Sequence, residues 1–187
     1  SIPGRGTHLC LKRLDRDLRK YREETQYCLK MDIEKFYPNV NHEINKRQWE
    51  RKFKDKDLLW LVFMIIDSME GEKGIAIGSL FSQWDGNFYL TPFDHWLKEE
   101  MKVRYYYRYM DDLVILSSDK DWLHYIRREV QKYLKENLDL ELNSNYQVFP
   151  VDIRGIDFVG YRHFRDYILL RKSTARNIKR KMRDIKT

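Results

Sequence analysis

The sequence has little cysteine, glycine and proline, and no long apolar run. Two cysteines, Cys10 and Cys28, cannot build a disulfide framework and lack the spacing of a zinc site, which predicts a reduced, cytosolic setting. The longest uninterrupted apolar run, 58–66, is far shorter than a membrane span, and the first residues contain no apolar signal segment. Because the chain does not start with Met, we expect either a fragment or a chain from which a tag was removed.

What the sequence does contain is charge and aromatic character. Lys and Arg total 36 against 29 Asp and Glu, 42% of residues are hydrophobic and 14% are aromatic, a composition typical of one folded domain. The charge is uneven, with a net +4 over 1–30, −5 over 31–160 and +8 over 161–187. Basic ends suit a polyanionic partner, and an acidic centre suits carboxylates that need a cation. Solvated helix faces would give the same pattern, so charge alone leaves both interpretations open.

Hydrophobic periodicity predicts helices interleaved with short strands, and therefore an α+β fold with an antiparallel sheet packed on helices. Helices are expected over 9–21, 42–53, 57–69, from Ser82, from Thr91 as an N-cap, and over 119–136. Strands are expected over 27–33, which Pro38 would end, over 103–109 and 113–117 as a hairpin, and near 138–142, 158–161 and 167–170. The helix over 57–69 is apolar nearly all round, which predicts that it is buried.

Two adjacent acids, Asp111 and Asp112, fall at the expected hairpin tip, with only Arg108 as a local basic partner. An acid-rich turn would explain them without any function. A third acid, Asp32, favours a functional interpretation of the pair instead. Strand alternation places Asp32 with Lys30 on the polar face of the strand over 27–33.

Three carboxylates on neighbouring strands can hold two Mg²⁺ ions, which prefer oxygen ligands, and two such ions promote in-line phosphoryl transfer. The five histidines are scattered and offer no zinc cluster, and neither a P-loop nor a Ser–His–Asp arrangement is present; these histidines are His8, His42, His95, His124 and His163.

Four segments occur in the order seen in reverse transcriptases: 31–38 (MDIEKFYP), 77–83 (IGSLFSQ), 109–112 (YMDD) and 158–161 (FVGY). Over nearly its whole length the chain resembles the bacterial group II-like (retron-type) lineage. The resemblance implies a polymerase palm with partial fingers and the start of a thumb helix. It divides the chain into partial fingers (1–27), palm (28–40), fingers helices (41–73), palm with the YMDD hairpin and primer grip (74–170) and the start of the thumb (171–187).

The same resemblance assigns the catalytic residues. Asp32, Asp111 and Asp112 would be the catalytic acids and, with the backbone carbonyl of Ile33, would bind two Mg²⁺ ions, for which Mn²⁺ can substitute. Tyr37 would be the steric gate that leaves no room for a ribonucleotide 2′-OH; a core aromatic is the alternative interpretation.

Further residues are implied for substrate binding. Phe36, Ile77, Gly78 and Gln83 would contact the incoming deoxynucleotide, and Gly160 and Tyr161 would belong to the primer grip, although Tyr161 could equally be a core aromatic. Basic residues would bind nucleic acid; these are Arg5, Arg13, Arg171, Lys172, Arg176, Lys179 and Arg180. The expected partners are an RNA template, a DNA or RNA primer, deoxynucleotides and an accessory nucleic-acid-binding protein, with no membrane.

Two departures from the usual pattern bear on function. Ile77 and Gln83 replace a Gln and a Pro, a variant typical of the error-prone enzymes of diversity-generating retroelements, which implies a bacterial or phage-encoded cytoplasmic protein. Asn145 stands where relatives have the Lys proposed to protonate pyrophosphate.

With fingers and thumb incomplete, we expect this chain alone to be weakly active or inactive. The alternative function is a non-catalytic nucleic-acid-binding scaffold in defence or assembly, and Tyr37 disfavours an RNA-synthesising polymerase.

Overall fold

The computed structural model of the chain describes residues 7–76 and 78–184. Its backbone contacts group into two compact units. The sheet unit comprises Ser1–Lys30, Tyr105–His124 and Gln147–Thr187, and the helical unit comprises Met31–Arg104 and Tyr125–Tyr146.

In chain order the elements are α1 (Thr7–Lys20), β1 (Tyr27–Asp32), α2 (Phe36–Asn39), α3 (His42–Lys52), α4 (Lys56–Ile66), α5 (Leu80–Tyr89), α6 (Thr91–His95), the π-helix η1 (Trp96–Glu100), β2 (Tyr105–Tyr109), β3 (Asp112–Ser117), α7 (Lys120–Leu138), β4 (Gln147–Pro150), α8 (Val151–Arg154), β5 (Ile156–Phe158), β6 (Tyr161–His163), β7 (Ile168–Leu170) and α9 (Lys172–Asp184).

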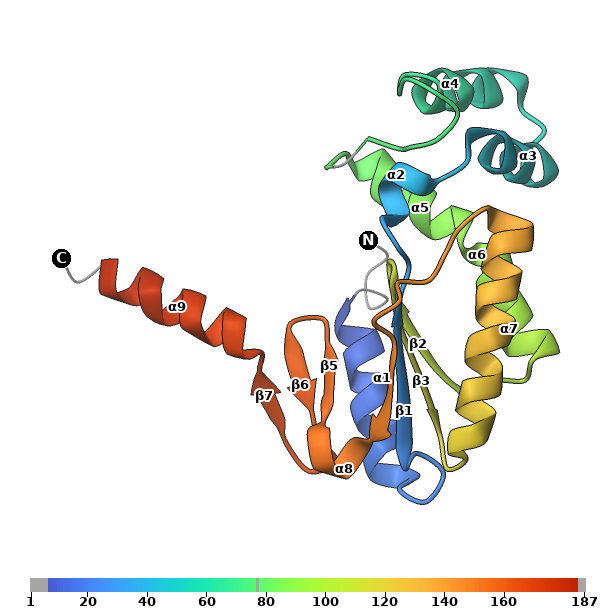
Figure 1. Ribbon diagram of the computed structural model, residues 1–187. Coiled ribbons are helices and arrows are strands. Elements are labelled where there is room, and N and C mark those ends of the chain that lie inside the picture. The colour runs from blue at the N-terminus through green and yellow to red at the C-terminus, as the bar shows by residue number, and fades with distance from the viewer. Residues whose placement is uncertain (1–6, 77, 185–187) are drawn as a thin grey trace. The chain divides into compact units, whose positions relative to one another are not determined.

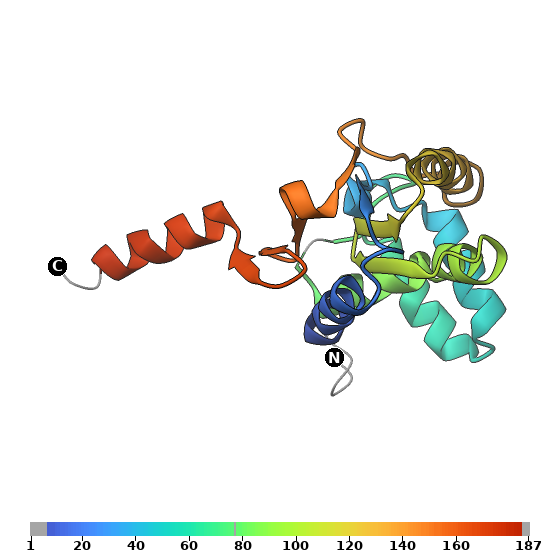
Figure 2. The ribbon, with the colours of Figure 1, turned by 90° about the horizontal axis from the view of Figure 1, so that it is seen from below.

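The sheet unit is built on a four-stranded sheet of order β2-β3-β1-β4, with α1 packed against one face (Figure 1 and Figure 2). Helix α1 buries Leu11, Leu14 and Leu18, whose spacing places them on one side of the helix. These leucines pack against side chains of alternate strand positions, including Cys28 of β1 and Val114 of β3. The polar strand face expected to carry Lys30 and Asp32 is therefore the face that α1 partly covers.

Two tyrosines of β2 fix α1 and the segment after it. The Tyr107 hydroxyl donates to Asp17 Oδ2 at 2.7 Å, and the Tyr105 hydroxyl donates to Glu24 Oε2 at 2.7 Å. Burial raises the pKa of Tyr107, so its hydroxyl stays protonated and remains a donor.

A second, three-stranded sheet of order β5-β6-β7 completes the sheet unit, and Arg165 attaches it to the segment that follows α1. The buried guanidinium donates to the Leu18 carbonyl at 3.1 Å and to the hydroxyl and carbonyl of Thr25 at 3.0 and 3.1 Å, and it pairs with Asp152. The hydrogen bonds and the ion pair give the guanidinium N–H groups partners. They therefore compensate for the loss of water around a charged side chain that is only 6% exposed.

The helical unit has an aromatic cluster at its centre. Trp49 of α3 lies 4.9 Å from the ring centroids of both Phe53 and Phe88, and Val62 and Ile66 of α4 pack against the same cluster. A buried carboxylate lies beside it, since Asp85 accepts hydrogen bonds from Trp49 Nε1 at 2.8 Å and Asn45 Nδ2 at 2.7 Å.

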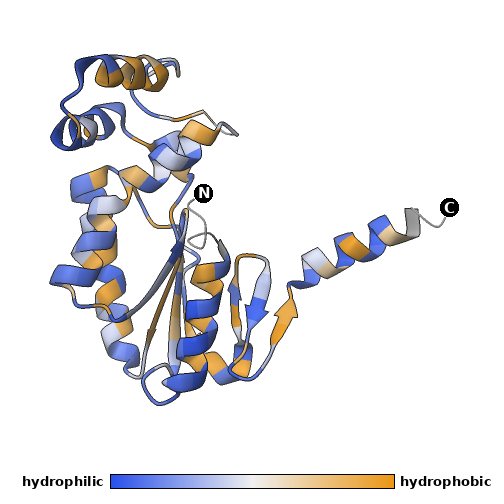
Figure 3. Cartoon of the chain, turned by 180° about the vertical axis from the view of Figure 1, so that it is seen from behind, coloured by the Kyte–Doolittle hydropathy of each residue, from blue (hydrophilic) through white to orange (hydrophobic). Residues whose placement is uncertain are grey.

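The architecture confirms the predicted α+β class and most element positions, but the prediction for α4 was wrong. Only Val62 and Ile66 of this helix are buried, while Trp60 is 64% exposed and Leu61, Met64 and Ile65 are also exposed. Figure 3 shows α4 as hydrophobic over most of its length. An apolar pattern shows which residues a helix could bury, but not whether a neighbouring element covers them. In this chain only one narrow side of α4 packs against neighbours.

Further local predictions were wrong. The single strand expected over 158–161 is instead a hairpin turn, with Val159 and Gly160 between β5 and β6. Thr91 is not an N-cap: helical backbone continues through Leu90, and the Thr91 hydroxyl donates to the Asn87 carbonyl. Pro38 lies within the one-turn helix α2, and β1 already ends at Asp32. No strand forms over 138–142 beyond an isolated bridge at Leu142, and the strand that pairs with β1 is β4 instead. Of the described helices, none is both long and apolar enough to cross a bilayer.

Candidate active site

The two adjacent acids lie at the tip of the β2–β3 hairpin, as predicted. Tyr109 pairs with Asp112, which leaves Met110 and Asp111 as a two-residue turn. Met110 has a φ of 54°, a left-handed value that favours glycine, and of the two turn residues only Met110 has a positive φ, the pattern of a type II′ turn. The Arg108 guanidinium donates to the Met110 carbonyl at 3.1 Å, so Arg108 holds the turn backbone.

Asp112 is held by a lysine from the neighbouring strand. Lys30 of β1 donates to Asp112 Oδ1, and the two side chains are only 21% and 23% exposed. Burial raises the pKa of Asp112, while the charges of Lys30 and, more weakly, Arg171 act in the opposite direction. The sequence showed only Arg108 as a local basic partner, and the ion-pair partner of Asp112 comes instead from a residue 82 positions away.

Asp111 differs from its neighbour in its surroundings. Its side chain is half-buried, and it makes no hydrogen bond or ion pair with any other residue that the structure describes. One carboxylate of the pair is thus neutralised by a lysine, whereas the other is available to a ligand.

Asp32 is the last residue of β1, two positions after Lys30, and strand alternation directs both side chains to the same face. Its carbonyl accepts from the Asn143 N–H at 2.8 Å, and the Glu34 N–H donates to the Glu141 carbonyl at 2.8 Å. These two bonds flank the bridge between Ile33 and Leu142, so the Ile33 carbonyl is directed away from this partner segment.

The donor set suits a hard cation, since it offers carboxylate and peptide oxygens without histidine or cysteine. Among residues 7–76 and 78–184, however, no group of three or more His, Cys, Asp and Glu side chains is close enough to hold a metal ion. Asp112 uses Oδ1 to accept from Lys30, so Oδ2 is the oxygen it could offer to a cation while this bond is kept.

The residues expected to contact the incoming nucleotide have different surroundings. Phe36 is 2% exposed, and a Cβ added to Gly86 would meet its ring at 3.0 Å, so Phe36 is a core residue. Tyr37 is half-buried and packs edge-on against Phe36 with ring centroids 5.4 Å apart. Phe36 therefore supports the Tyr37 ring from inside the helical unit.

The segment before α5 contains the other nucleotide-contact candidates. Gly78 is exposed with a φ of 95°, a backbone conformation that most other residues avoid, and Gln83 is exposed on α5. Ser79 caps α5 by accepting from the Ser82 N–H, so the helix begins earlier than the Ser82 start that was predicted. Ile77 lies outside the described residues.

Gly160 and Tyr161 lie at the tip of the β5–β6 hairpin. Phe158 pairs with Tyr161 across a turn formed by Val159 (φ 49°) and Gly160 (φ 82°). Tyr161 is half-buried and packs against the hydrophobic core that includes the leucines of α1. Its surroundings therefore fit both a primer-grip residue and a core aromatic.

The basic residues expected to bind nucleic acid are mostly on α9. Lys172, Arg176, Lys179 and Arg180 are exposed there, and Arg13 is exposed on α1. Arg171 differs, because its Nε donates to Asp157 Oδ1 at 2.7 Å and its N–H donates to the Gly160 carbonyl at 3.0 Å. Arg5 lies outside the described residues.

The residue that sequence reasoning missed is Lys30. The available signal was its position two residues before Asp32 on the same strand face, which pointed to a cation beside the carboxylates.

Comparison with known proteins decides the family. The profile described as reverse transcriptase (RNA-dependent DNA polymerase) matches residues 2–163, most of the chain. The chain belongs to the reverse transcriptase family. None of the curated proteins matches the chain.

Solved structures agree on the fold. The chain is similar to telomerase from Candida albicans in complex with the TWJ fragment of telomeric RNA, with a TM-score of 0.66 and 11% identity over 89% of this chain and 34% of the telomerase. It is also similar to apo telomerase from Candida tropicalis, with a TM-score of 0.63 and 13% identity over 88% of this chain and 36% of that one. A third similar structure is apo telomerase from Candida tropicalis truncated from the C-terminal domain. Its TM-score is 0.64 and its identity 15%, over 89% of this chain and 40% of that one. This reverse transcriptase chain thus has a telomerase-like fold and spans about a third of the length of these telomerases.

Proposed function

We propose that the chain carries the palm of an RNA-directed DNA polymerase, which extends a DNA or RNA primer on an RNA template with deoxynucleotides. The observation that carries this proposal is the β2–β3 hairpin of a reverse transcriptase family member, with Asp111 and Asp112 intact at its tip and one of them held from β1. The segments 1–27 and 41–73 are proposed as fingers, 28–40 and 74–170 as palm, and 171–187 as the start of a thumb.

Asp32, Asp111, Asp112 and the Ile33 carbonyl are the proposed ligands of two Mg²⁺ ions, with Mn²⁺ as a substitute. Covalent geometry supports this set, because Lys30 bonds to Asp112 and Asp32 follows two residues later. Two residues of extended chain span at most about 7 Å, and alternation directs Lys30 and Asp32 to one face. When bound, the cations would stabilise negative charge on the triphosphate and favour loss of the primer hydroxyl proton.

The other residues of the site bind and orient the reactants, and positioning supplies much of the rate. Tyr37, supported by Phe36, is proposed to lie beneath the sugar and to exclude a 2′-OH. Gly78, Ile77 and Gln83 are proposed to lie along the incoming nucleotide and template base. Gly160 and Tyr161 are proposed to hold the primer 3′ end, while the exposed basic residues of α9, with Arg13 and Arg5, contact phosphates.

We place the chain among the enzymes of diversity-generating retroelements, encoded by a bacterium or phage and acting in the cytoplasm with an accessory nucleic-acid-binding protein. Ile77 and Gln83 support this subtype, because loss of the usual Gln amide removes a hydrogen bond near the nascent base pair. The telomerase likeness concerns the fold and gives no reason to propose telomere synthesis. A neighbouring gene with a variable repeat and an imperfect template copy is the genomic observation that tests this assignment.

One observation favours a second candidate, a polymerase-like scaffold that binds nucleic acid without synthesis. Asn145 lies exposed in a turn where relatives have a proton-donating lysine, and an amide does not donate a proton usefully at neutral pH.

Primer extension by the full-length protein separates these candidates. With an RNA template, a DNA primer, Mg²⁺ and deoxynucleotides we expect extension, and Asp111→Asn should lower its rate by at least about 100-fold because several kcal/mol of charge stabilisation are lost. Asp121→Asn, an exposed acid in the first turn of α7, is the matched control and should leave the rate unchanged. Binding of the template–primer without extension would support the scaffold, and equal rates for the two variants would refute the proposed site.

A further inference from the structure

Lys30 contacts two hairpins of the sheet unit at once. Its Nζ bonds to the Asp112 carboxylate of the β2–β3 hairpin and lies 5.1 Å from the centroid of the Phe158 ring at the end of β5. Phe158 is fully buried, and its strand partner Tyr161 opens β6 across the two-residue turn. An ammonium that is paired with a carboxylate and stacked on an aromatic face is restricted from two sides.

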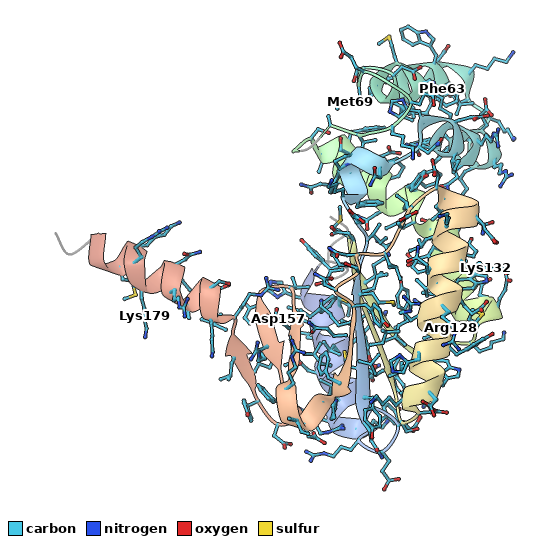
Figure 4. The ribbon with its side chains drawn as sticks, in the orientation of Figure 1. Phe63, Met69, Arg128, Lys132, Asp157 and Lys179 are labelled. Atoms are coloured by element: carbon cyan, nitrogen blue, oxygen red, sulfur yellow. The ribbon has the colours of Figure 1, made fainter. Side chains whose placement is uncertain are left out.

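The contacts continue through the β5–β6 hairpin. Asp157, labelled in Figure 4, precedes Phe158 and pairs with Arg171, whose N–H also bonds to the Gly160 carbonyl at the hairpin tip. Arg171 also acts on Asp112 through its charge. Lys30 thus contacts both hairpins, while Arg171 bonds to the second one at Asp157 and at its tip.

We propose that Lys30 is a positioning residue of the polymerase site, which fixes the Asp112 carboxylate and aligns the β2–β3 hairpin with the β5–β6 hairpin. This rests on the proposed function, in which the first hairpin carries catalytic acids and the second holds the primer. Lys30 also separates the roles of the adjacent acids, since Asp112 is fixed by an ammonium whereas Asp111 is left to accept a cation.

The proposal predicts a specific pattern for two substitutions. Lys30→Met removes the ammonium and leaves the Asp112 carboxylate unpaired, which should lower kcat by at least about 30-fold while the KM for deoxynucleotides changes less than threefold. Lys30→Arg keeps a cation that can pair with the carboxylate and stack on the ring, and it should recover at least tenfold of that loss.

Lys20→Met is the matched control. Lys20 lies over an aromatic ring, 5.3 Å from the centroid of Tyr21, but has no carboxylate partner among the described residues. It should behave like the unchanged protein. A Lys30→Met variant with kcat within threefold of Lys20→Met, or no better rate for Lys30→Arg than for Lys30→Met, would overturn the proposal.

A readout without activity or metal keeps the proposal separable from the proposed function. In the metal-free protein, proton NMR should show the Lys30 ε-methylene signals shifted upfield by the Phe158 ring. Phe158→Leu should abolish the shift, and Asp112→Asn should reduce it because the lysine is no longer fixed. If the protein makes no DNA and the shift is present, the polymerase proposal fails while the Lys30 contacts stand; unshifted signals contradict the Lys30 proposal whatever the activity.

Discussion

Single residues at the two hairpin tips have unfavourable backbone conformations. Met110 and Val159 are both in the left-handed region, at φ values of 54° and 49°, where a side chain costs about 1–2 kcal/mol. Each lies next to a residue assigned to the site, Asp111 in one hairpin and Gly160 in the other. The surrounding contacts, such as the Arg108 bond to the Met110 carbonyl, hold conformations that the turns alone would not favour.

Tyr37 gives a residue-scale prediction about sugar selection. Replacing Tyr37 with Val removes the ring while the supporting Phe36 stays in the core, so we expect discrimination against ribonucleotides to fall by about 10- to 100-fold. The measurement is the ratio of kcat/KM for deoxy- and ribonucleotides in primer extension. Tyr37→Phe keeps the ring and serves as control; an unchanged ratio in Tyr37→Val would show that Tyr37 is only a core aromatic.

Sequence reasoning at the residue scale succeeded where chemistry is local and failed where it depends on a distant partner. The adjacency of Asp111 and Asp112 and the apolar face of β1 are visible in the sequence, and the structure places both as predicted. Local alternation places Lys30 on the same strand face as Asp32, but its bond to Asp112 joins residues 82 positions apart, so the local pattern could not say which carboxylate it pairs with.

Elements were predicted well where periodicity was clean. Helices α1 and α7 bury the leucines and branched residues that their spacing indicated. The prediction for α4 was wrong because a helix with apolar residues on all sides gives no indication of which side another element covers. Strand β4 was missed because four residues, Gln147–Pro150, give too short an alternation to recognise, and it forms only through pairing with β1.

The contact between α3 and α5 gives an element-scale prediction about pH. Burial raises the pKa of Asp85, although hydrogen bonds from Trp49 and Asn45 act in the opposite direction. Asn45 Oδ1 is buried without a partner among the described residues, and a side-chain amide at position 85 could donate to it once the Asn45 amide turns over to present this oxygen. We therefore expect Asp85→Asn to raise the free energy of unfolding at pH 7 by about 1 kcal/mol.

The sign of the pH effect follows from the direction of the shift. Because the folded state holds the Asp85 proton more tightly than the unfolded state, wild-type stability rises relative to the variant as pH falls toward the ordinary aspartate pKa. Urea denaturation followed by tryptophan fluorescence should show the advantage of Asp85→Asn shrinking from pH 7 to pH 4. An advantage that grows over this range would contradict the assignment, and Asp85→Leu, which leaves both donors unpaired, should be destabilising at every pH.

At the scale of the whole molecule, the charge is concentrated where the proposed function needs it. The last segment, 161–187, has a net charge of +8, and α9 presents its exposed lysines and arginines beside the apolar Ile178 and Met182, an alternation visible in Figure 3. A helix of this kind can follow a phosphate backbone without reading sequence. Counterions are released only where a basic side chain contacts a phosphate. The position of the basic side chains on the protein, rather than its net charge, should therefore decide how strongly it binds nucleic acid.

Two double variants with the same change in net charge test this. Lys179→Gln with Arg180→Gln removes two charges from α9, and Arg128→Gln with Lys132→Gln removes two exposed charges from α7; Figure 4 labels Lys179, Arg128 and Lys132. For an RNA–DNA duplex, the slope of log K against log salt should become shallower by about 1–2 units in the α9 variant, since each lost phosphate contact removes about 0.9. The α7 variant should keep the original slope. Equal changes in both variants would mean that net charge alone attracts the nucleic acid, and no change in either would remove α9 from the binding surface.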